Sequence, residues 1–198
     1  MASKDRIRRL KEDTRVNILE ASLSIVKNDG WNALSMRKIA DEIEYTAPII
    51  YEYFKSKEDI LLELTKKGFL MLAETMKEAK ERHRTPAKQL EAMWLAYWNF
   101  GFEEKELYQV MFGVSTSFCE MAKTMPEVEL HTDLVCDVIA TLMEVDPEHE
   151  KVCRTYYTFW SVVHGLISIT FVGKSNSDEI NRHVFKTAIS GIIRSIKD

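Results

Sequence analysis

The chain has 198 residues, of which 45% are hydrophobic and 29% charged, and its formal net charge is −4 at pH 7. This is ordinary globular composition, with enough apolar residues for a sizeable core in one or two domains. Only 7 glycines and 4 prolines are present, which argues against disorder and against a barrel or sandwich. Leu, Ile, Met, Ala, Glu and Lys dominate and favour helices, so we expect an all-α fold.

Apolar runs, the amino terminus and the cysteines indicate the compartment. No run of about 18 apolar residues is present, as a membrane-spanning helix would need. The amino terminus is charged, so we expect no signal peptide. Cys119, Cys136 and Cys153 are odd in number and lack CxxC spacing. We expect a cytoplasmic protein with no metal, no cofactor and no membrane partner.

Basic residues gather at the start of the chain, although the net charge is negative. Residues 1–11 contain Lys4, Arg6, Arg8, Arg9 and Lys11, against the single acid Asp5. The distribution of charge matters more than its sum for an anionic partner. We expect residues 1–13 to form a flexible basic arm. It is either a solvated tail or, as the family resemblance described below implies, an arm that reaches a DNA groove.

The first helix after this arm is expected near residues 14–28. Ile18, Ser22, Ile25 and Val26 recur on one face of it, which we expect to be buried, as in an amphipathic helix. Gly30 is a natural residue just beyond its carboxyl terminus.

Residues 35–54 predict two short helices joined by a tight turn. Ser35 and Thr46 stand where the two N-caps belong. The apolar stripe of the first helix is Met36, Ile39, Ala40 and Ile43, and that of the second is Ala47, Ile50 and Phe54. Two such helices, each with one buried and one exposed face, are typical of the helix-turn-helix, whose second helix enters the major groove of DNA.

Further residues around these helices carry a resemblance to a known family. They are Ile18-Leu19-x-Ala21-Ser22 with Gly30, Ile39-Ala40, Tyr51-x-Tyr53-Phe54, and Lys55 to Leu61, where Ser56 and Asp59 can form a capping box. Over roughly residues 14–64 the chain resembles the DNA-binding domain of the TetR family of bacterial one-component transcriptional regulators. The resemblance implies a regulator, by default a repressor, that binds a palindromic operator in double-stranded DNA as a homodimer.

The rest of the chain predicts further helices and no strand. A long helix is expected from Ser56 to about Arg82, and others near 86–100, 105–112, 126–143, 147–172 and from Ser177. The expected total is about nine helices. We expect a flexible arm (1–13), a helix-turn-helix domain (14–55), a connecting helix (56–84) and an effector-binding and dimerisation body (85–198).

Ten residues are candidates for DNA contact, in two groups. Those expected to position the head on phosphates are Ser35, Lys38, Thr46, Tyr51, Tyr53 and Lys57. Those expected to read bases are Arg37, Ala47, Pro48 and Ile49. Arg37 can pair with guanine, whereas the others can contact only thymine methyl groups, so we expect thymine-rich contacts. Tyr53 alternatively packs beside Phe54, and Glu44 stands in the turn where the family often has glycine.

Large soft side chains are dense in residues 90–125 and 156–171. Such a stripe is either core or the lining of a pocket, and many of these residues have polar tips. We expect a pocket for a hydrophobic or aromatic small-molecule effector, which the resemblance also places in this body. The candidates are Trp94, Trp98, Phe112, Phe118, Tyr156, Trp160 and His164. His164 lies in Trp160-x-x-x-His164-Gly165, which resembles a motif of one subgroup, and is otherwise a core histidine.

The last two helices are candidates for a dimer interface. An apolar stripe on the last helix consists of Phe185, Ile189, Ile192, Ile193 and Ile196. Small residues on the helix before it, which allow close approach, are Ser161, Gly165 and Ser168. The resemblance implies a four-helix bundle between two copies. The alternative is that both stripes are used inside one chain.

Other functional classes have weaker support. The five histidines are scattered without metal spacing and no glycine-rich phosphate loop is present, so we expect no enzyme. A regulator on the same scaffold that senses metal or redox state through Cys and His stays open. So does a helical protein–protein adaptor. Cys136 and Cys153 lie on helical stripes, as small core residues do.

Overall fold

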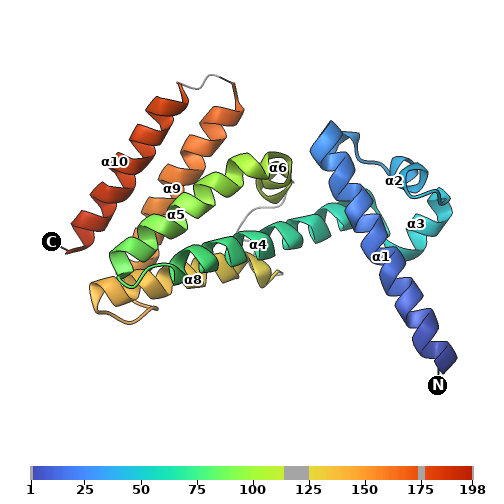
Figure 1. Cartoon of the computed structure of the whole chain (residues 1–198), viewed down its shortest axis with the longest axis horizontal. Coiled ribbons are helices and arrows are strands. Elements are labelled where there is room, and N and C mark those ends of the chain that lie inside the picture. The colour runs from blue at the N-terminus through green and yellow to red at the C-terminus, as the bar shows by residue number, and fades with distance from the viewer. Residues whose placement is uncertain (1, 114–124, 174–176, 198) are drawn as a thin grey trace. The chain divides into compact units, whose positions relative to one another are not determined.

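The computed structural model describes residues 2–113, 125–173 and 177–197. Within these ranges the chain forms nine α-helices, one 3-10 helix and no strand (Figure 1), which confirms the predicted all-α fold. None of the described helices combines the length and the apolar character that a bilayer crossing requires. The chain divides into two compact units.

The first unit consists of the chain up to Gly68 together with α6. Its helices are α1 (Ala2–Asp29), η1 (Trp31–Ala33), α2 (Met36–Glu42), α3 (Ala47–Tyr53), the first part of α4 (Lys57–Glu81) and α6 (Lys105–Gly113). The helix α1 contacts α2, η1 and α6, while α2 packs on α3. The fully buried core side chains include Ile18, Val26, Ile39, Ile50, Leu64 and Val110. The predicted body, residues 85–198, therefore includes one helix, α6, that packs with the head.

The start of α1 differs from the prediction. The helix begins at Ala2, so the boundary predicted near Thr14 is wrong, and the residues predicted as a flexible arm are helical from Ala2 onward. Residues 2–13 contain neither glycine nor proline and consist mostly of good helix formers. The side chains of residues 4–13 are all exposed. This segment lacks an apolar stripe because it has no surface to bury, and not because it lacks helical structure.

The predicted caps are confirmed at two of three positions in the head. Ser35 Oγ accepts the N–H of Lys38 at 3.2 Å. Ser56 Oγ accepts the N–H of Asp59 at 3.2 Å, and Asp59 Oδ2 accepts a backbone N–H in return, from Lys55 at 3.0 Å.

Thr46 occupies the N-cap position of α3, but its side chain makes no capping hydrogen bond. An N-cap side chain accepts from the second or third helical N–H. Here the second residue is Pro48, which has no N–H, and the third, Ile49, donates to the Thr46 carbonyl at 2.9 Å. The predicted capping by the Thr46 side chain is wrong for this reason.

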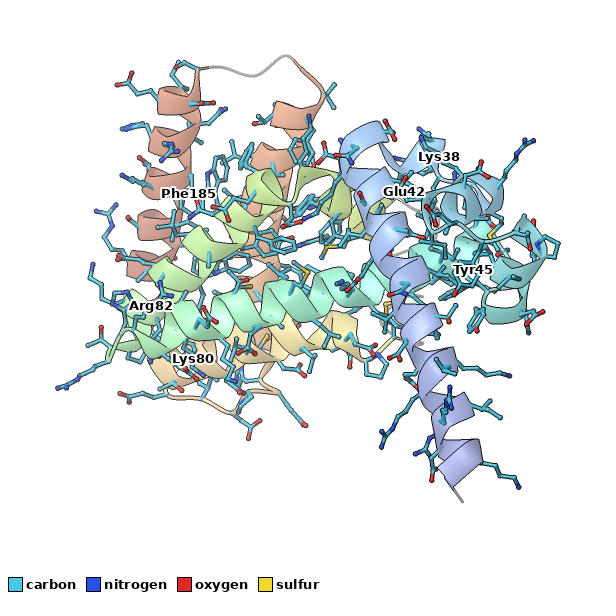
Figure 2. All side chains as sticks on the ribbon, turned by 45° about the vertical axis from the view of Figure 1, so that its right-hand side comes forward. Lys38, Glu42, Tyr45, Lys80, Arg82 and Phe185 are labelled. Carbon is cyan, nitrogen blue, oxygen red and sulfur yellow. The ribbon has the colours of Figure 1, made fainter. Side chains whose placement is uncertain are left out.

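The turn between α2 and α3 is built around Glu44, whose φ of 56° lies in the left-handed region. The N–H of Tyr45 donates to the Ala40 carbonyl at 2.9 Å, and that of Glu44 to the Asp41 carbonyl at 3.4 Å. These two bonds form a Schellman motif, which usually has glycine at the left-handed position. Figure 2 labels Glu42 and Tyr45, which flank this turn.

The second unit contains the rest of α4 with α5 (Pro86–Glu103), α8 (Glu127–Met143), α9 (Glu150–Phe171) and α10 (Asp178–Lys197). The helix α5 lies at its centre and contacts α8, α9 and α10, and α9 packs along α10 (Figure 1). The buried side of α5 consists of Leu90, Met93, Trp94, Tyr97, Trp98, Phe100 and Gly101.

Helix boundaries in this unit follow the predicted signals with two exceptions. Ser177 Oγ accepts the N–H of Ile180 at 3.4 Å at the start of α10, as expected. The helix α5 continues through Gly101 to Glu103 instead of ending there. The helix α9 begins at Glu150, later than predicted, because His149 is its N-cap and accepts the N–H of Lys151 at 3.2 Å through Nδ1.

Candidate functional sites

The exposed side of α2 and α3 carries the predicted DNA contacts. None of the ten predicted residues is buried: Ser35, Arg37, Thr46, Pro48 and Tyr51 are exposed, and Lys38, Ala47, Ile49, Tyr53 and Lys57 are partly exposed. On the other side of α3, Ile50 and Phe54 are buried in the head. The two short helices therefore present a face with both polar and apolar side chains outward on a well-packed base.

A shallow groove joins the starts of α2 and α4 with the middle of α3. Its lining residues are Leu34, Ser35, Met36, Arg37, Tyr51, Lys55, Ser56, Lys57 and Glu58. It brings together four predicted contacts, and adds Lys55, which the prediction missed although it stands in the same motif. Three basic side chains in one groove suit a phosphate group. The one carboxylate in this lining is that of Glu58. A hydrogen bond to its own backbone and a second one to the Ser56 side chain lower the pKa of this carboxyl group.

Two of the predicted lysines are held by the protein itself. Lys38 Nζ lies 2.8 Å from Asp29 Oδ2 (Lys38 is labelled in Figure 2). Lys57 Nζ donates to the Asn32 carbonyl at 3.3 Å and lies 5.8 Å from the centroid of the Trp31 ring. A phosphate has to compete with these contacts. Among the described residues, Arg37 finds no ion pair or hydrogen bond for its side chain, so its guanidinium is free for a partner.

In the second unit, Trp94 and Tyr156 lie in a packed aromatic cluster. The Trp94 ring is stacked on Phe159 at a centroid distance of 5.4 Å, and lies 5.5 Å from Tyr97 and 6.0 Å from Tyr156. Both predicted ligand residues are almost fully buried. In the described structure these two residues form part of the core, which agrees with the interpretation of the aromatic stripe as core and not as the lining of a pocket.

Polar atoms inside the cluster are incompletely paired. The Thr132 hydroxyl donates to Tyr156 Oη at 3.0 Å, and Tyr156 Oη lies 3.2 Å from Nε2 of the fully buried His131. Within the described ranges, Nδ1 of His131 and Nε1 of Trp94 have no hydrogen-bond partner of good geometry. Burial lowers the pKa of His131 to about 4, against the smaller effect of the Val128 backbone, which raises it. Unpaired buried polar atoms are unusual in folded proteins, and such an atom often marks the position of a bound water molecule or ligand.

His131 was not among the predicted site residues, because its sequence position was considered only as one of five scattered histidines. A signal was present, because Val128, His131, Val135 and Val138 recur at helical spacing on α8 and all four are buried. A histidine on an apolar stripe is placed inside the fold by its neighbours.

The remaining predicted ligand residues lie in several places. The rings of Trp160 and His164 are stacked at 5.0 Å, and Trp160 Nε1 donates to Tyr97 Oη at 3.1 Å. Partial burial lowers the pKa of His164. Phe112 belongs to the first unit, where its ring lies 4.6 Å from that of Tyr108. Phe118 lies outside the described residues, as does Cys119.

A cavity of about 270 Å³ lies between α5 and α10. Its lining residues are Trp98, Asn99, Phe102, Glu103, Asp178, Asn181 and Arg182. Trp98 and Phe102 form an aromatic pair at a centroid distance of 4.8 Å, and the rest of the lining is polar or charged. Of the predicted ligand residues that the structure describes, Trp98 alone borders this cavity.

The predicted dimer stripe on α10 is used inside the chain. Phe185, Ile189 and Ile193 are 4%, 2% and 5% exposed. Phe185, labelled in Figure 2, packs on Trp98 of α5 at a centroid distance of 5.1 Å. Their assignment to a dimer interface is therefore wrong, because this face of α10 covers α5. Ile192 and Ile196 lie on the same side and are partly exposed.

The small residues predicted on α9 lie on a different surface. Ser161, Gly165 and Ser168 are at least partly exposed, on the side of α9 away from its buried residues. Large apolar side chains that are 40–79% exposed lie on α9 (Tyr157 and Ile169), at its C-cap (Val172) and on α10 (Ile180 and Val184). An exposed apolar surface of this kind is typical of an interface.

The cysteines and histidines form no cluster in the part of the chain that the structure describes. No three side chains of His, Cys, Asp or Glu come together there as a metal site would require. Cys136 is partly buried, and burial raises the pKa of its thiol to about 12, whereas Cys153 is exposed.

A three-helix head with an exposed helix-turn-helix, followed by a helical body, is the architecture of a DNA-binding transcriptional regulator. Comparison with family models defines the family. Residues 18–64 match the model described as bacterial regulatory proteins of the tetR family, and residues 90–191 match the tetracycline repressor-like C-terminal domain. The chain belongs to the TetR family of transcriptional regulators.

Proteins with similar sequences are also named as regulators. The chain is 31% identical over 94 residues to an uncharacterised helix-turn-helix regulator of Haemophilus influenzae, covering 48% of this chain and 50% of that protein. It is 30% identical over 80 residues to the fatty acid metabolism regulator protein of Bacillus subtilis, covering 40% and 41%. The chain thus spans half or less of the length of these two relatives.

Solved structures share the fold. A protein of unknown function from Rhodococcus sp. RHA1 superposes with a TM-score of 0.79 at 19% identity, over 93% of this chain and 95% of that one. The regulator FadR of Bacillus subtilis, solved in complex with stearoyl-CoA, superposes with a TM-score of 0.66 at 18% identity, over 89% and 98%.

Proposed function

We propose that the chain is a repressor that binds a palindromic operator as a homodimer and is released by a hydrophobic small-molecule effector. The observation that carries the DNA-binding part is the outward face of α2 and α3, where the exposed Arg37 lines a basic groove. Binding-site selection from random duplexes, followed by fluorescence anisotropy on the selected site, tests it. A purified chain that enriches no sequence and does not bind its own upstream DNA would overturn the proposal.

The proposed base code assigns guanine to Arg37 and thymine methyl groups to Ala47, Pro48 and Ile49. Arg37→Ala should cost about 1–3 kcal/mol in operator binding and relax the preference at one position. The matched control is Lys38→Ala, the adjacent cation, whose amine is paired with Asp29. It should weaken binding less and without a change in base preference. Equal losses for both variants, or a selected site without thymines under α3, would contradict the code.

Two heads must reach successive major grooves, about 34 Å apart, for a palindromic site to be read. We place the dimer interface on the exposed faces of α9 and α10, because small residues there adjoin exposed apolar side chains. Ser161→Arg should then produce a monomer in sedimentation and reduce operator affinity. Thr141→Arg, which adds the same charge at an exposed position of α8, is the control. A wild-type chain that sediments as a monomer would refute the dimer.

The proposed effector is hydrophobic, and acyl chains are the first class to test. The aromatic body supports this, and so do the Bacillus subtilis matches, a sequence named for fatty acid metabolism and a structure solved with stearoyl-CoA. An effector changes DNA affinity only by the difference in its affinity for the two states. A panel of fatty acids, acyl-CoA thioesters and aromatic compounds should contain one that binds and weakens the operator complex. A bound ligand that leaves operator affinity unchanged at saturation would refute release.

A further inference from the structure

The first turns of α1 carry a stripe of basic residues. Lys4, Arg8, Lys11 and Arg15 follow one another at intervals of four, three and four residues, which places them on one face of a helix. The stripe exists only because this segment is helical, as the structure shows from Ala2 onward. The other two arginines of the segment, Arg6 and Arg9, fall on the other side of the helix.

This stripe borders α3. A groove in the first unit is lined by residues of α1 on one side and by Glu52 and Tyr53 of α3 on the other (both helices appear in Figure 1). The residues contributed by α1 are Lys4, Ile7, Arg8, Lys11, Glu12 and Arg15. Two carboxylates, Glu12 and Glu52, therefore face four basic side chains, and the groove carries a net positive charge.

The end of the stripe nearest the core is held by packing. Arg15 Nη2 lies 3.0 Å from Glu63 Oε2, and its guanidinium lies 5.0 Å above the Phe54 ring. The other cations are free to bind a partner. Among the described residues Lys4 and Lys11 have no ion pair, and Arg8 has only an exposed contact of 3.8 Å with Asp5, which is worth little in water.

We propose that this stripe is a second DNA-contact surface, which binds phosphates beside the base pairs that α3 reads. The inference rests on the proposed function and adds a site to it. From Lys4 to Arg15 the helix rises about 17 Å, at 1.5 Å per residue, which corresponds to about five base pairs of duplex. Lysine and arginine side chains at the surface bind phosphates without reading sequence. A helix presents them in fixed positions, so less ordering entropy is lost on binding than with a flexible arm.

The experiment compares two double variants of the full chain that lose the same charge. Arg8→Gln/Lys11→Gln removes two cations from the stripe, and Arg6→Gln/Arg9→Gln removes two from the other side of the same helix. Each is titrated by fluorescence anisotropy against the selected operator duplex and a scrambled duplex, over a range of salt concentrations. Circular dichroism checks that both variants keep the helix content of the wild type.

The stripe variant should bind both duplexes more weakly by a similar factor, and its log–log salt slope should fall by about 0.9 for each phosphate that it no longer neutralises. The other variant should stay close to the wild type. Equal effects of the two variants, or no effect of either, would overturn the proposal while leaving operator binding intact. A wild-type chain that binds no duplex would refute the proposed function instead. Binding of phosphatidylglycerol vesicles that depends on Arg8 and Lys11, with DNA affinity unchanged, would also overturn it and assign the stripe to a membrane surface.

Discussion

The hydroxyl of Tyr156 lies 3.2 Å from Nε2 of His131, inside the aromatic core of the second unit. Because the Thr132 hydroxyl already donates to Tyr156 Oη, we expect Tyr156 to donate its own proton to Nε2. Nε2 therefore accepts, and the single proton of the neutral ring belongs on Nδ1. A histidine in this position is a stabilising residue only while it stays uncharged.

The stability of the second unit should therefore fall in mild acid. Burial lowers the pKa of His131 from 6.5 to about 4. Between these values the unfolded chain binds a proton that the folded chain excludes, so stability is lost as the pH falls from about 6.5 towards 4, by on the order of 3 kcal/mol. Urea unfolding at pH 7 and pH 5 should detect about 2 kcal/mol of this loss, because pH 5 lies about 1.5 units below the unfolded pKa.

The matched variants for this pH dependence are His131→Phe and His183→Gln. The first removes the buried titrating group and should flatten the dependence, with a residual slope from His164, whose pKa is also lowered by burial. The second changes an exposed residue of α10 and should keep the wild-type slope. If His131→Phe retains the full slope, another group is responsible.

Glu44→Gly should stabilise the head. Glu44 has a φ of 56°, where a side chain costs about 1–2 kcal/mol that glycine avoids. We expect a gain of about 1 kcal/mol in the free energy of unfolding, measured with chemical denaturant. Glu42→Gly, in the last helical position of α2, should instead destabilise by about 0.5–1 kcal/mol. The same sign for both variants would contradict the argument from backbone conformation.

Local rules predicted the head well because its signals are local. Ser35 and Ser56 cap their helices through hydrogen bonds to residues three positions later, which the sequence displays directly. Thr46 shows the limit of such rules. Its capping partner is absent because Pro48 has no N–H and Ile49 is already bonded to the Thr46 carbonyl.

Tertiary packing decided what the sequence left open. The stripe around Phe185 predicts a buried face, but amphipathicity does not say whether the face is covered by the same chain or by another, and here α5 covers it. The same limit applies to Trp94 and His131, because a helical stripe does not distinguish a filled core from a pocket. The start of α1 was missed for the opposite reason, since a wholly exposed helix has no apolar period to detect.

Gly101→Ala should destabilise the second unit although it improves helix propensity. A Cβ at position 101 would lie 2.8 Å from Cδ1 of Ile167 and 3.2 Å from its Cγ2. We expect a net cost of about 1–2 kcal/mol, because overpacking outweighs the propensity gain of about 1 kcal/mol. In an Ile167→Val background, which lacks Cδ1, the cost should shrink, and a double-mutant cycle by urea unfolding measures the coupling. Gly191→Ala on α10, where no described atom lies within 4 Å of the added Cβ, should be neutral or stabilising. Purely additive effects at positions 101 and 167 would contradict the close approach.

Cys136 and Cys153 should differ sharply in thiol reactivity. Only the thiolate reacts, and a thiol with a pKa of about 12 is ionised to about one part in ten thousand at pH 8. Cys153 is exposed on α9, so in a Cys119→Ser background a disulfide reagent such as DTNB should modify it first and Cys136 orders of magnitude more slowly. The variants Cys119→Ser/Cys153→Ser and Cys119→Ser/Cys136→Ser each leave one of the two thiols, and both should react rapidly in urea. Equal rates in the native protein would show that Cys136 is accessible as a thiolate, and would revive the alternative of a redox-sensing regulator.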